Sequence, residues 1–445
     1  MDFLEMVKES GIIGAGGAGF PTHAKLAAKA DYILMNGAEC EPLLRVDQQL
    51  MARYPKEIIL GFEAAGRIVQ AEKAIIGIKG KHRDVIEILE KTIEELKLSD
   101  YVSIGILPDI YPAGDEQVLV YELTGRVVPE AGIPIRVGCV VMNTETALNV
   151  YKAAAGTPVI EKYITIAGDV PDRKTVKVPV GMPILDVLKM SGIDDFSDYA
   201  VIGGGPMMGP VLKNIDGYVT KKDKGFVVLK KDHPLIRKKT VTKEQARRVN
   251  RATCEQCRMC TDMCPRFLLG HGTQPHLMMR ALNCNLTDIN THTAAQLCCQ
   301  CNLCNLFSCQ VGLFPKDANN FFREELAAKK IKYQPTKEVF EPRAAREYRL
   351  VPSKRLVARI GLTEFDKPSP MTEEAVCPEI VHIALSQHVG APAQPIVKVG
   401  DKVKKGQKIG AIPEGSLGAA VHASISGEVT ACEDGYIVIR REENV

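Results

Sequence analysis

The sequence predicts a multidomain protein of mixed α/β and α+β class, and three observations support this prediction. Its 445 residues exceed the usual length of one domain, so about three domains are expected. Short apolar runs alternate with helical patterns near the N-terminus, whereas residues 376–445 combine short strand patterns with frequent glycines. Between these two parts, ten of the 14 cysteines crowd into residues 254–309.

Bulk composition narrows the class of protein. Apolar residues make up 45% and charged residues 25%, as in ordinary globular proteins, and the net charge of +3 does not suggest a nucleic-acid binder. Cysteines spaced two residues apart favour metal ligation over a disulfide scaffold. The N-terminus lacks the pattern of a secretory signal, and no apolar run approaches the ~20 residues that span a bilayer. We therefore expect a cytoplasmic protein with no membrane span.

Residues 1–160 read as an α/β domain. The apolar runs at 32–35, 74–78 and 102–106 suit buried strands. Between the last two runs, Val85, Leu89, Ile93 and Leu96 recur at helical spacing with charged residues between them. This pattern predicts a helix that covers a sheet.

The next segments change in texture. Residues 163–166 and 175–178 flank a turn at 169–172 and predict a hairpin, and residues 183–190 predict a helix, so a small β-grasp-like domain fits residues 161–228. Its role as a spacer is favoured. The basic stretch 230–251 is interpreted as a solvated linker rather than a docking patch. Residues 229–335 hold the cysteines, residues 336–375 form a proline-containing connection, and residues 376–445 are expected to be all-β.

The cysteine pattern carries the strongest chemical signal. Cys254, Cys257, Cys260 and Cys264, followed by proline, have the spacing of a bacterial two-cluster ferredoxin, in which the fourth cysteine ligates the other 4Fe–4S cluster. A second run follows, with one extra residue before its last cysteine: Cys298, Cys301, Cys304 and Cys309. We therefore assign two clusters with crossed ligands, one on Cys254, Cys257, Cys260 and Cys309, and the other on Cys264, Cys298, Cys301 and Cys304.

Alternatives to this assignment are weaker. Structural zinc needs four ligands from two Cys-x-x-Cys pairs, and two full runs exceed that requirement. Cys299 lies too close to Cys301 to replace Cys298 in an ordinary loop. Cys284 is expected to be a buried thiol, and three histidines are expected at helix ends or on the surface: His271, His276 and His292.

A glycine-rich loop near the N-terminus predicts a phosphate or ring site. Gly14, Gly16, Gly17 and Gly19 allow main-chain N–H groups to approach a ligand closely, and Lys25 follows. The loop is neither a Walker loop nor a clear Rossmann fingerprint, and a turn without a ligand remains an alternative. After the first strand, Asn36, Glu39 and Glu41 stand at a carboxyl end, where α/β proteins bind ligands.

These motifs together resemble the flavin-binding subunit of respiratory complex I and the C subunit of Rnf-type complexes. Residues 111–116 and 143–146 also resemble segments beside the flavin in those families. The resemblance implies non-covalent FMN, with NADH stacked on it as the electron donor. Ala38 departs from the complex I pattern, which has an aspartate there. The implied flavin and nucleotide site comprises Gly14, Gly16, Gly17, Gly19, Phe20, Lys25, Asn36, Glu39, Glu41, Glu116, Asn143 and Thr146.

In this resemblance Lys25 contacts the FMN phosphate, Glu41 lies near the nicotinamide nucleotide and Phe20 stacks on its adenine. Residues 164–212 resemble the soluble-ligand-binding β-grasp domain of the same families. Residues 399–429 resemble a lipoyl or biotinyl barrel-sandwich. No lysine follows Lys408, so the barrel lacks a residue that could carry a swinging group.

In its domain order and in the sequence of residues 257–266, the chain most resembles the cobalamin reductase family of propanediol-utilisation microcompartments. That resemblance implies an NADH-dependent flavo-iron–sulfur reductase that supplies reduced cobalamin to an adenosylcobalamin enzyme. A flavin takes up a hydride and releases single electrons, which suits a cobalt reduced in one-electron steps. The implied partners are cobalamin or a corrinoid-handling protein, other electron-transfer proteins and the shell of a bacterial microcompartment.

A rival hypothesis is a non-enzymatic relay subunit in an Rnf-like complex, with a degenerate flavin domain. Ala38 is compatible with this rival. No Asp-x-His-x-x-Gly corrinoid signature is present, so cobalamin would dock transiently.

Overall fold

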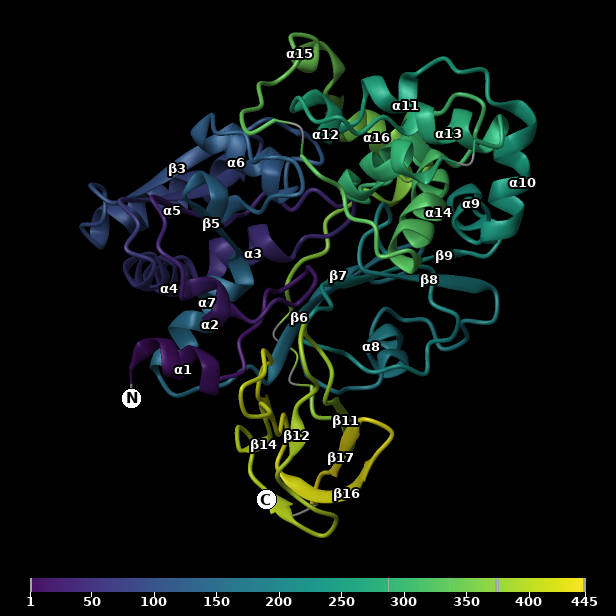
Figure 1. Ribbon diagram of the computed structural model, residues 1–445. Coiled ribbons are helices and arrows are strands. Elements are labelled where there is room, and N and C mark those ends of the chain that lie inside the picture. The colour runs from purple at the N-terminus through teal and green to yellow at the C-terminus, as the bar shows by residue number, and fades with distance from the viewer. Residues whose placement is uncertain (1, 287, 336, 373, 375, 443–445) are drawn as a thin grey trace.

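The computed structural model describes residues 2–286, 288–335, 337–372, 374 and 376–442 (Figure 1). A parallel four-stranded sheet in the order β3-β2-β1-β5 forms the centre of the N-terminal part. In this sheet Asn36 pairs with Asn143, so the carboxyl ends of two neighbouring strands coincide. Its strands are β1 (Tyr32–Asn36), β2 (Lys73–Lys79), β3 (Val102–Leu107) and β5 (Cys139–Asn143).

Helices cover this sheet, as the sequence predicts for residues 85–96. Val85, Leu89 and Ile93 of α5 all point into the core. The helices α4 and α7 approach closely because Gly61 has no side chain. A Cβ at this position would lie 2.1 Å from the Ala147 carbonyl oxygen. The helical segments are α1 (Phe3–Glu9), α2 (Thr22–Leu26), α3 (Val46–Arg53), α4 (Pro55–Ile68), α5 (Arg83–Glu95), α6 (Glu116–Thr124), η1 (Pro134–Val137) and α7 (Thr144–Ala154).

A second, mixed sheet follows in the order β7-β6-β9-β8. The predicted hairpin is present, because β6 and β7 pair antiparallel, while β6 and β9 pair parallel. Ile164, Val176 and Phe226 lie in the core between this sheet and α8. The elements are β6 (Glu161–Gly168), β7 (Lys174–Pro179), α8 (Ile184–Lys189), β8 (Tyr199–Gly203) and β9 (Gly225–Lys230).

The cysteine module is helical, and its helical region begins earlier than expected. The stretch 230–251, predicted as a solvated linker, forms α9 and α10, so that prediction is wrong. Thr242 and Gln245 form a reciprocal capping box, and Ala246 and Asn250 share one buried face of α10. The helical segments are α9 (Pro234–Lys239), α10 (Lys243–Thr253), α11 (Met259–Asp262), α12 (Pro265–Leu268), α13 (Pro275–Asn283), η2 (Ile289–Leu297), η3 (Cys304–Ser308) and α14 (Pro315–Ala328).

The segment after the module has its own elements. The short strand β10 pairs antiparallel with β4, so this segment packs on the N-terminal part of the molecule. Leu356 and Leu362 are fully buried in a core shared with Tyr111 and Cys301. The elements are β4 (Ile110–Tyr111), α15 (Arg346–Arg349), β10 (Val351–Pro352), α16 (Ser353–Arg359) and η4 (Thr363–Phe365).

Two antiparallel sheets make up the C-terminal lobe, drawn in yellow-green to yellow in Figure 1. Val381, Ile409 and Ile439 are buried between them. The sheets have the orders β11-β17-β16-β13 and β12-β14-β15. Their strands are β11 (Ile380–Ala384), β12 (Gln394–Pro395), β13 (Lys402–Val403), β14 (Lys408–Ala411), β15 (Val421–His422), β16 (Gly427–Glu433) and β17 (Tyr436–Arg440).

This lobe is fastened to the rest of the chain by a buried lysine. Lys221 Nζ donates to the carbonyl oxygens of Gly11 and Ala420, each at 2.8 Å, and so joins the second sheet to the N-terminal part and to the C-terminal lobe. Burial lowers the pKa of Lys221 to about 7. The Val389 N–H also donates to the Gly19 carbonyl at 3.1 Å. The lobe therefore borders the glycine-rich loop.

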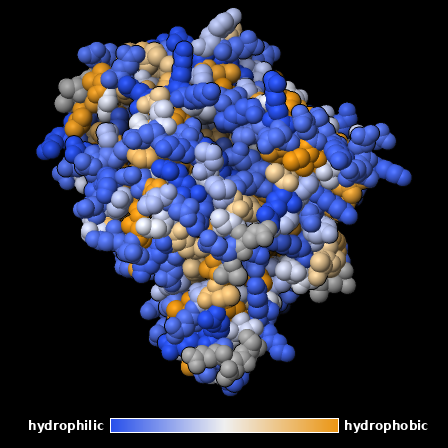
Figure 2. Space-filling view, turned by 180° about the vertical axis from the view of Figure 1, so that it is seen from behind, coloured by the Kyte–Doolittle hydropathy of each residue, from blue (hydrophilic) through white to orange (hydrophobic). Residues whose placement is uncertain are grey.

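The surface seen from behind is mostly hydrophilic, with apolar residues in small groups (Figure 2). Among the helices of the described residues, none has the length and apolar character needed to cross a bilayer.

Candidate flavin site and cysteine sets

The predicted flavin residues gather at the carboxyl edge of the parallel sheet. Asn36 ends β1 beside Asn143, and its Nδ2 donates to the Gly114 carbonyl at 2.9 Å. Asn143 precedes α7, which brings Thr146 under the glycine-rich loop. The Ala15 N–H donates to Thr146 Oγ1 at 3.1 Å. Three segments far apart in the sequence therefore meet at one edge.

The loop between Gly14 and Phe20 offers free donors. Gly14 N donates to the Phe20 carbonyl at 2.9 Å and closes the loop. Within the described residues, the main-chain N–H groups of residues 16–19 have no hydrogen-bond acceptor. A Cβ on Gly17 would meet nothing within 4 Å, so the loop leaves open space at that position. Free N–H groups beside open space fit a phosphate of FMN.

Gly16 and Gly19 are required for a different reason. Both adopt left-handed conformations, with φ of +86° and +74°. A Cβ on Gly19 would lie 2.9 Å from the Lys222 side chain and 3.0 Å from the Gln387 carbonyl. The second sheet and the C-terminal lobe therefore form walls of this loop, and the local sequence gives no sign of them.

Lys25 and Glu116, both predicted in the flavin site, contact each other. Lys25 Nζ lies 3.0 Å from Glu116 Oε1 and 2.8 Å from the Val141 carbonyl. Asp115 caps α6 by accepting from the N–H groups of residues 117 and 118, and this fixes Glu116 at the helix start. The ammonium group of Lys25 therefore lies between the start of α6 and the strand β5.

Glu39 lies in a buried charge cluster. Its carboxylate accepts from the Asp47 N–H at 3.0 Å at the start of α3, and Lys224 pairs with Asp47 and approaches Glu39 at 4.0 Å. Burial, followed by the charge of Asp47, raises the pKa of Glu39 to about 7. Lys224 was not identified by sequence reasoning. Its pKa is raised despite burial, because Asp47 and Glu39 face it.

Glu41, expected near the nicotinamide nucleotide, forms its hydrogen bonds with the second sheet domain. It accepts from the N–H groups of Met207 at 2.8 Å and Met208 at 3.0 Å, and Tyr111 Oη lies 3.3 Å from it. Burial raises the pKa of Glu41 above its usual range. Phe20 is 37% exposed, which leaves its ring accessible.

The sequence predicts two groups of cysteines that cross between the runs. Burial raises the pKa of Cys260 to about 12, and the thiols that add to this increase are Cys254, Cys309 and Cys257. The pKa of Cys301 is also raised well above its usual range; its hydrogen bond with Cys299 and burial contribute most, followed by the charges of Cys299, Cys264 and Cys304. Burial raises the pKa of Cys304 well above its usual range, and three thiols add to this increase: Cys298, Cys260 and Cys264. Because Cys260 is also a neighbour of Cys304, the division into sets stays a prediction. The first predicted set is Cys254, Cys257, Cys260 and Cys309, and the second is Cys264, Cys298, Cys301 and Cys304.

The two cysteine loops repeat each other residue by residue. Gln256 and Arg258 have positive φ, and so do Gln300 and Asn302 at the same offsets in the second loop. Gln256 Nε2 donates to Cys254 Sγ at 3.2 Å, and Gln300 Nε2 donates to Cys298 Sγ at 3.3 Å. This repeat aligns Cys298 with Cys254.

Cys299 is then an extra thiol beside the second set. The charges of Arg266 and Asp115 both act on it, and Arg266 Nη2 donates to Asp115 at 2.8 Å. Sequence reasoning missed both Arg266 and Tyr111 as neighbours of the cysteines, because their partners lie about 150 residues or more away. A long-range contact of this kind leaves no periodic signal.

The remaining sequence predictions for this region need correction. Cys284 is exposed rather than buried. Three histidines are buried rather than on the surface: His271, His276 and His292. Of these three, His276 lies in the first turn of a helix. His271 and His276 use polar partners within the protein, the Val128 carbonyl and the Thr261 hydroxyl.

Within the described part of the chain, no three His, Cys, Asp or Glu side chains converge on one point as they would around a single ion. A cubane does not require such convergence, because each of its four thiolates binds a different iron at a different corner. Two 4Fe–4S clusters on crossed sets of four thiols therefore stay a prediction.

Three domain families match the chain in the order of its lobes. Residues 7–152 match the Nuo51 FMN-binding domain, residues 253–314 match the 4Fe-4S dicluster domain, and residues 365–444 match the RnfC barrel sandwich hybrid domain. The multidomain architecture with these three domain types is therefore confirmed.

A solved structure supports the fold alone. It is an air-oxidized NAD+-reducing [NiFe]-hydrogenase, with a TM-score of 0.50 and 22% identity, covering 82% of this chain and 67% of that one.

Relatives found by sequence show more than the fold. One component of the Na(+)-translocating ferredoxin:NAD(+) oxidoreductase complex of Acetobacterium woodii is 35% identical over 271 residues, 59% of this chain and 58% of the relative. Cobalamin reductase PduS of Citrobacter freundii is 39% identical over 98% of this chain and 96% of the relative. Cobalamin reductase PduS of Salmonella typhimurium is 40% identical over 99% of this chain and 96% of the relative. The similarity to these two reductases extends over nearly the whole sequence, so the chain belongs to the PduS cobalamin reductase family.

Proposed function

We propose that the protein is an NADH-dependent flavo-iron–sulfur reductase that reduces cobalamin for an adenosylcobalamin-dependent enzyme. The observation that carries this proposal is the direct contact between the nucleotide domain and the cysteine module, where Tyr111 Oη donates to the Cys301 carbonyl at 2.8 Å. A flavin site and a cluster site built against each other suit transfer of single electrons.

The chain's own residues have distinct tasks in this proposal. The N–H groups of residues 16–19 and Lys25 bind the FMN phosphate, while Asn36, Asn143 and Thr146 fix the loop and the strand ends around the ring. FMN, when bound, accepts a hydride and releases electrons singly, and each 4Fe–4S cluster carries one electron. The two cysteine sets hold the clusters, and Phe20 offers an exposed ring on which an adenine could stack.

We assign the finer architecture as part of the same proposal. The mixed sheet of β6–β9 with α8 serves as a β-grasp spacer between the lobes, and the two C-terminal sheets form a barrel-sandwich without an attachment lysine. The partners are cobalamin or a corrinoid-handling protein, and the setting is a propanediol-utilisation microcompartment, as the PduS relatives suggest.

The test is anaerobic purification with iron, sulfide and flavin quantified, followed by addition of NADH and hydroxocobalamin. We expect NADH oxidation coupled to the spectral change of cobalt reduction. Oxidation of NADH with an artificial acceptor but no reduction of cobalamin would contradict the proposal.

A relay protein without its own NADH chemistry is the second candidate, favoured by one observation. The Glu41 carboxylate accepts hydrogen bonds from the N–H groups of Met207 and Met208, so it has fewer acceptor positions left for a nicotinamide nucleotide. Protein that carries iron and sulfide but no flavin after anaerobic purification would support the relay instead.

A further inference from the structure

The two cysteine sets differ in what surrounds them. Cys301 packs in one core with Leu43 and Tyr111 of the nucleotide domain. Cys254 and Cys309 instead border a separate core formed by α13 and α14. Cys301 of the second set therefore shares a core with the domain that carries the flavin residues.

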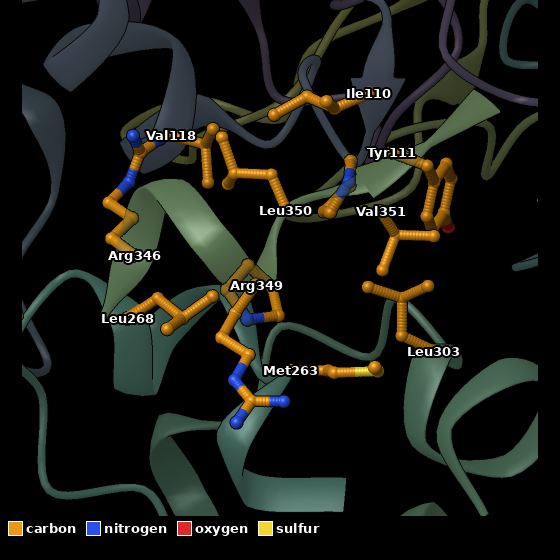
Figure 3. A pocket seen from close by; sticks show the side chains of 12 residues that line it. Ile110, Tyr111, Val118, Met263, Leu268, Leu303, Arg346, Arg349, Leu350 and Val351 are labelled. Atoms are coloured by element: carbon orange, nitrogen blue, oxygen red, sulfur yellow. The ribbon is translucent and has the colours of Figure 1, made fainter. Parts of the chain in front are cut away.

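The packing at this junction is tight. Figure 3 shows Tyr111 and Val351 facing Leu303 and Met263, which flank the second cysteine set along the chain. The pocket at this junction offers a volume of about 10 Å³, which is about what one water molecule needs.

Hydrogen bonds fix the second loop to the same domain. The single phenol hydrogen of Tyr111 favours the Cys301 carbonyl at 2.8 Å over Glu41 at 3.3 Å. Asn302, the next residue, donates from Nδ2 to the Met207 carbonyl at 3.0 Å. Since Glu41 binds the Met207 N–H, these contacts join Glu41, Tyr111 and the loop in one network.

A buried ion pair makes a second connection. Arg266, two residues after Cys264, contacts Asp115 at 2.8 Å, and their side chains are 13% and 11% exposed. Asp115 caps α6, whose first residue is Glu116 of the flavin site. The second set is thus linked to the flavin site from two directions.

The first set includes an exposed thiol. Cys257 is exposed, and the Arg258 side chain beside it is 53% exposed. Among the described residues, no hydrogen bond joins residues 254–260 to residues 2–160.

We propose that the second set, Cys264, Cys298, Cys301 and Cys304, holds the cluster that receives electrons from the flavin, and that Tyr111 is its positioning residue. The first set holds the cluster from which electrons leave. This order rests on the proposed function. NADH loses a hydride and becomes NAD+, its two electrons pass singly through the second set to the first, and the proton is released to water.

The test compares Cys301→Ala with Cys257→Ala in the full chain, each reconstituted anaerobically with FMN and retaining one cluster. Electron paramagnetic resonance follows reduction of that cluster by NADH and, separately, by dithionite. We expect Cys257→Ala to keep reduction by both reagents. We expect Cys301→Ala to lose reduction by NADH and to keep reduction by dithionite.

Two kinds of failure are distinguishable. If NADH fails to reduce any cluster in the wild-type protein, the proposed function fails. If the wild-type clusters respond but the two variants behave alike or in the opposite way, the order of the clusters is wrong.

Tyr111→Phe gives a second readout that does not depend on the cysteine variants folding. We expect a shift in the midpoint potential of one cluster, that of the second set, with the other unchanged. Tyr333→Phe is the matched control, because Tyr333 joins its hydroxyl to Glu130 of the nucleotide domain without bonding to a cysteine loop. No shift in Tyr111→Phe, or an equal shift in both clusters, would overturn the positioning role.

Discussion

The cysteine module and the flavin site are built by contacts of different range. Each cysteine loop sets its own geometry within a few residues, through positive φ at fixed offsets and a glutamine that donates to the first sulfur. The glycine-rich loop depends on partners that are distant in the sequence: Thr146 of its own domain, and Lys222 and the Gln387 carbonyl from other parts of the chain. The comparison teaches that the module is specified locally, whereas the flavin site is specified by the assembly of the whole chain.

The largest expected effect lies on the flavin side. Lys162 Nζ pairs with Glu145 Oε2 at 2.5 Å, and both side chains are almost fully buried. Lys162→Met leaves Glu145 buried without a partner in the first turn of α7, so we expect a loss of about 3–5 kcal/mol in unfolding free energy. Urea unfolding followed by circular dichroism measures this loss.

A matched pair in the module sharpens the contrast. Lys243 and Glu324 form an ion pair with side chains 80% and 60% exposed, so Lys243→Ala is expected to change stability by less than about 1 kcal/mol. The double variant Lys162→Met with Glu145→Leu should recover most of the loss. Equal effects in the buried and exposed pairs would break the comparison.

A pH dependence is expected next, from Glu39. Its pKa in the folded protein is about 7, above its ordinary value of 4.5, so the buried carboxylate costs stability once it ionises. Stability from this group is therefore present at low pH and is lost as the pH rises from about 4.5 through about 7. Urea midpoints measured across this range should fall less in Glu39→Gln than in the wild-type protein, and parallel profiles would refute the prediction.

The glycine-rich loop offers a smaller effect. Gly19→Ala forces a side chain into a left-handed conformation, at a cost of about 1–2 kcal/mol, and crowds Lys222 and Gln387. We expect lower thermal stability together with reduced flavin content. Gly17→Ala is the control for stability, because its Cβ would enter open space; flavin content is the property it should change. Unaltered flavin in both variants would argue against a phosphate at this loop.

The smallest effect belongs to the module. Thr242→Ala removes the capping box of α10 and should cost about 1 kcal/mol, as a local change in one helix. Iron and sulfide content should not change. A loss of iron would show that the module depends on distant contacts as much as the flavin site does.

Sequence reasoning succeeded where a pattern repeats over a short distance. The strands β1, β2 and β3, the helix α5 and the β6–β7 hairpin all follow from apolar periodicity. The helix α10 was missed although a signal existed, because Thr242 and Gln245 have the spacing of a capping box.

The remainder lay beyond a local pattern. Lys224 pairs with Asp47 across 177 residues, and Tyr111 contacts Cys301 across 190 residues. A lysine or tyrosine in such a pair looks like any surface residue in the sequence, because burial is decided by tertiary packing. The crossed cysteine sets remain a proposal that the neighbouring thiols around Cys260 and Cys304 support.

The junction at Lys221 has a practical consequence for dissecting this protein. Cutting the chain before residue 376 would remove the Ala420 acceptor from that ammonium and the Val389 donor from the loop at Gly19. Loss of bound flavin in such a truncated fragment would then reflect the lost contacts between the C-terminal lobe and the rest of the chain, not a missing flavin ligand. Point substitutions in the intact chain are the sound way to map its redox centres.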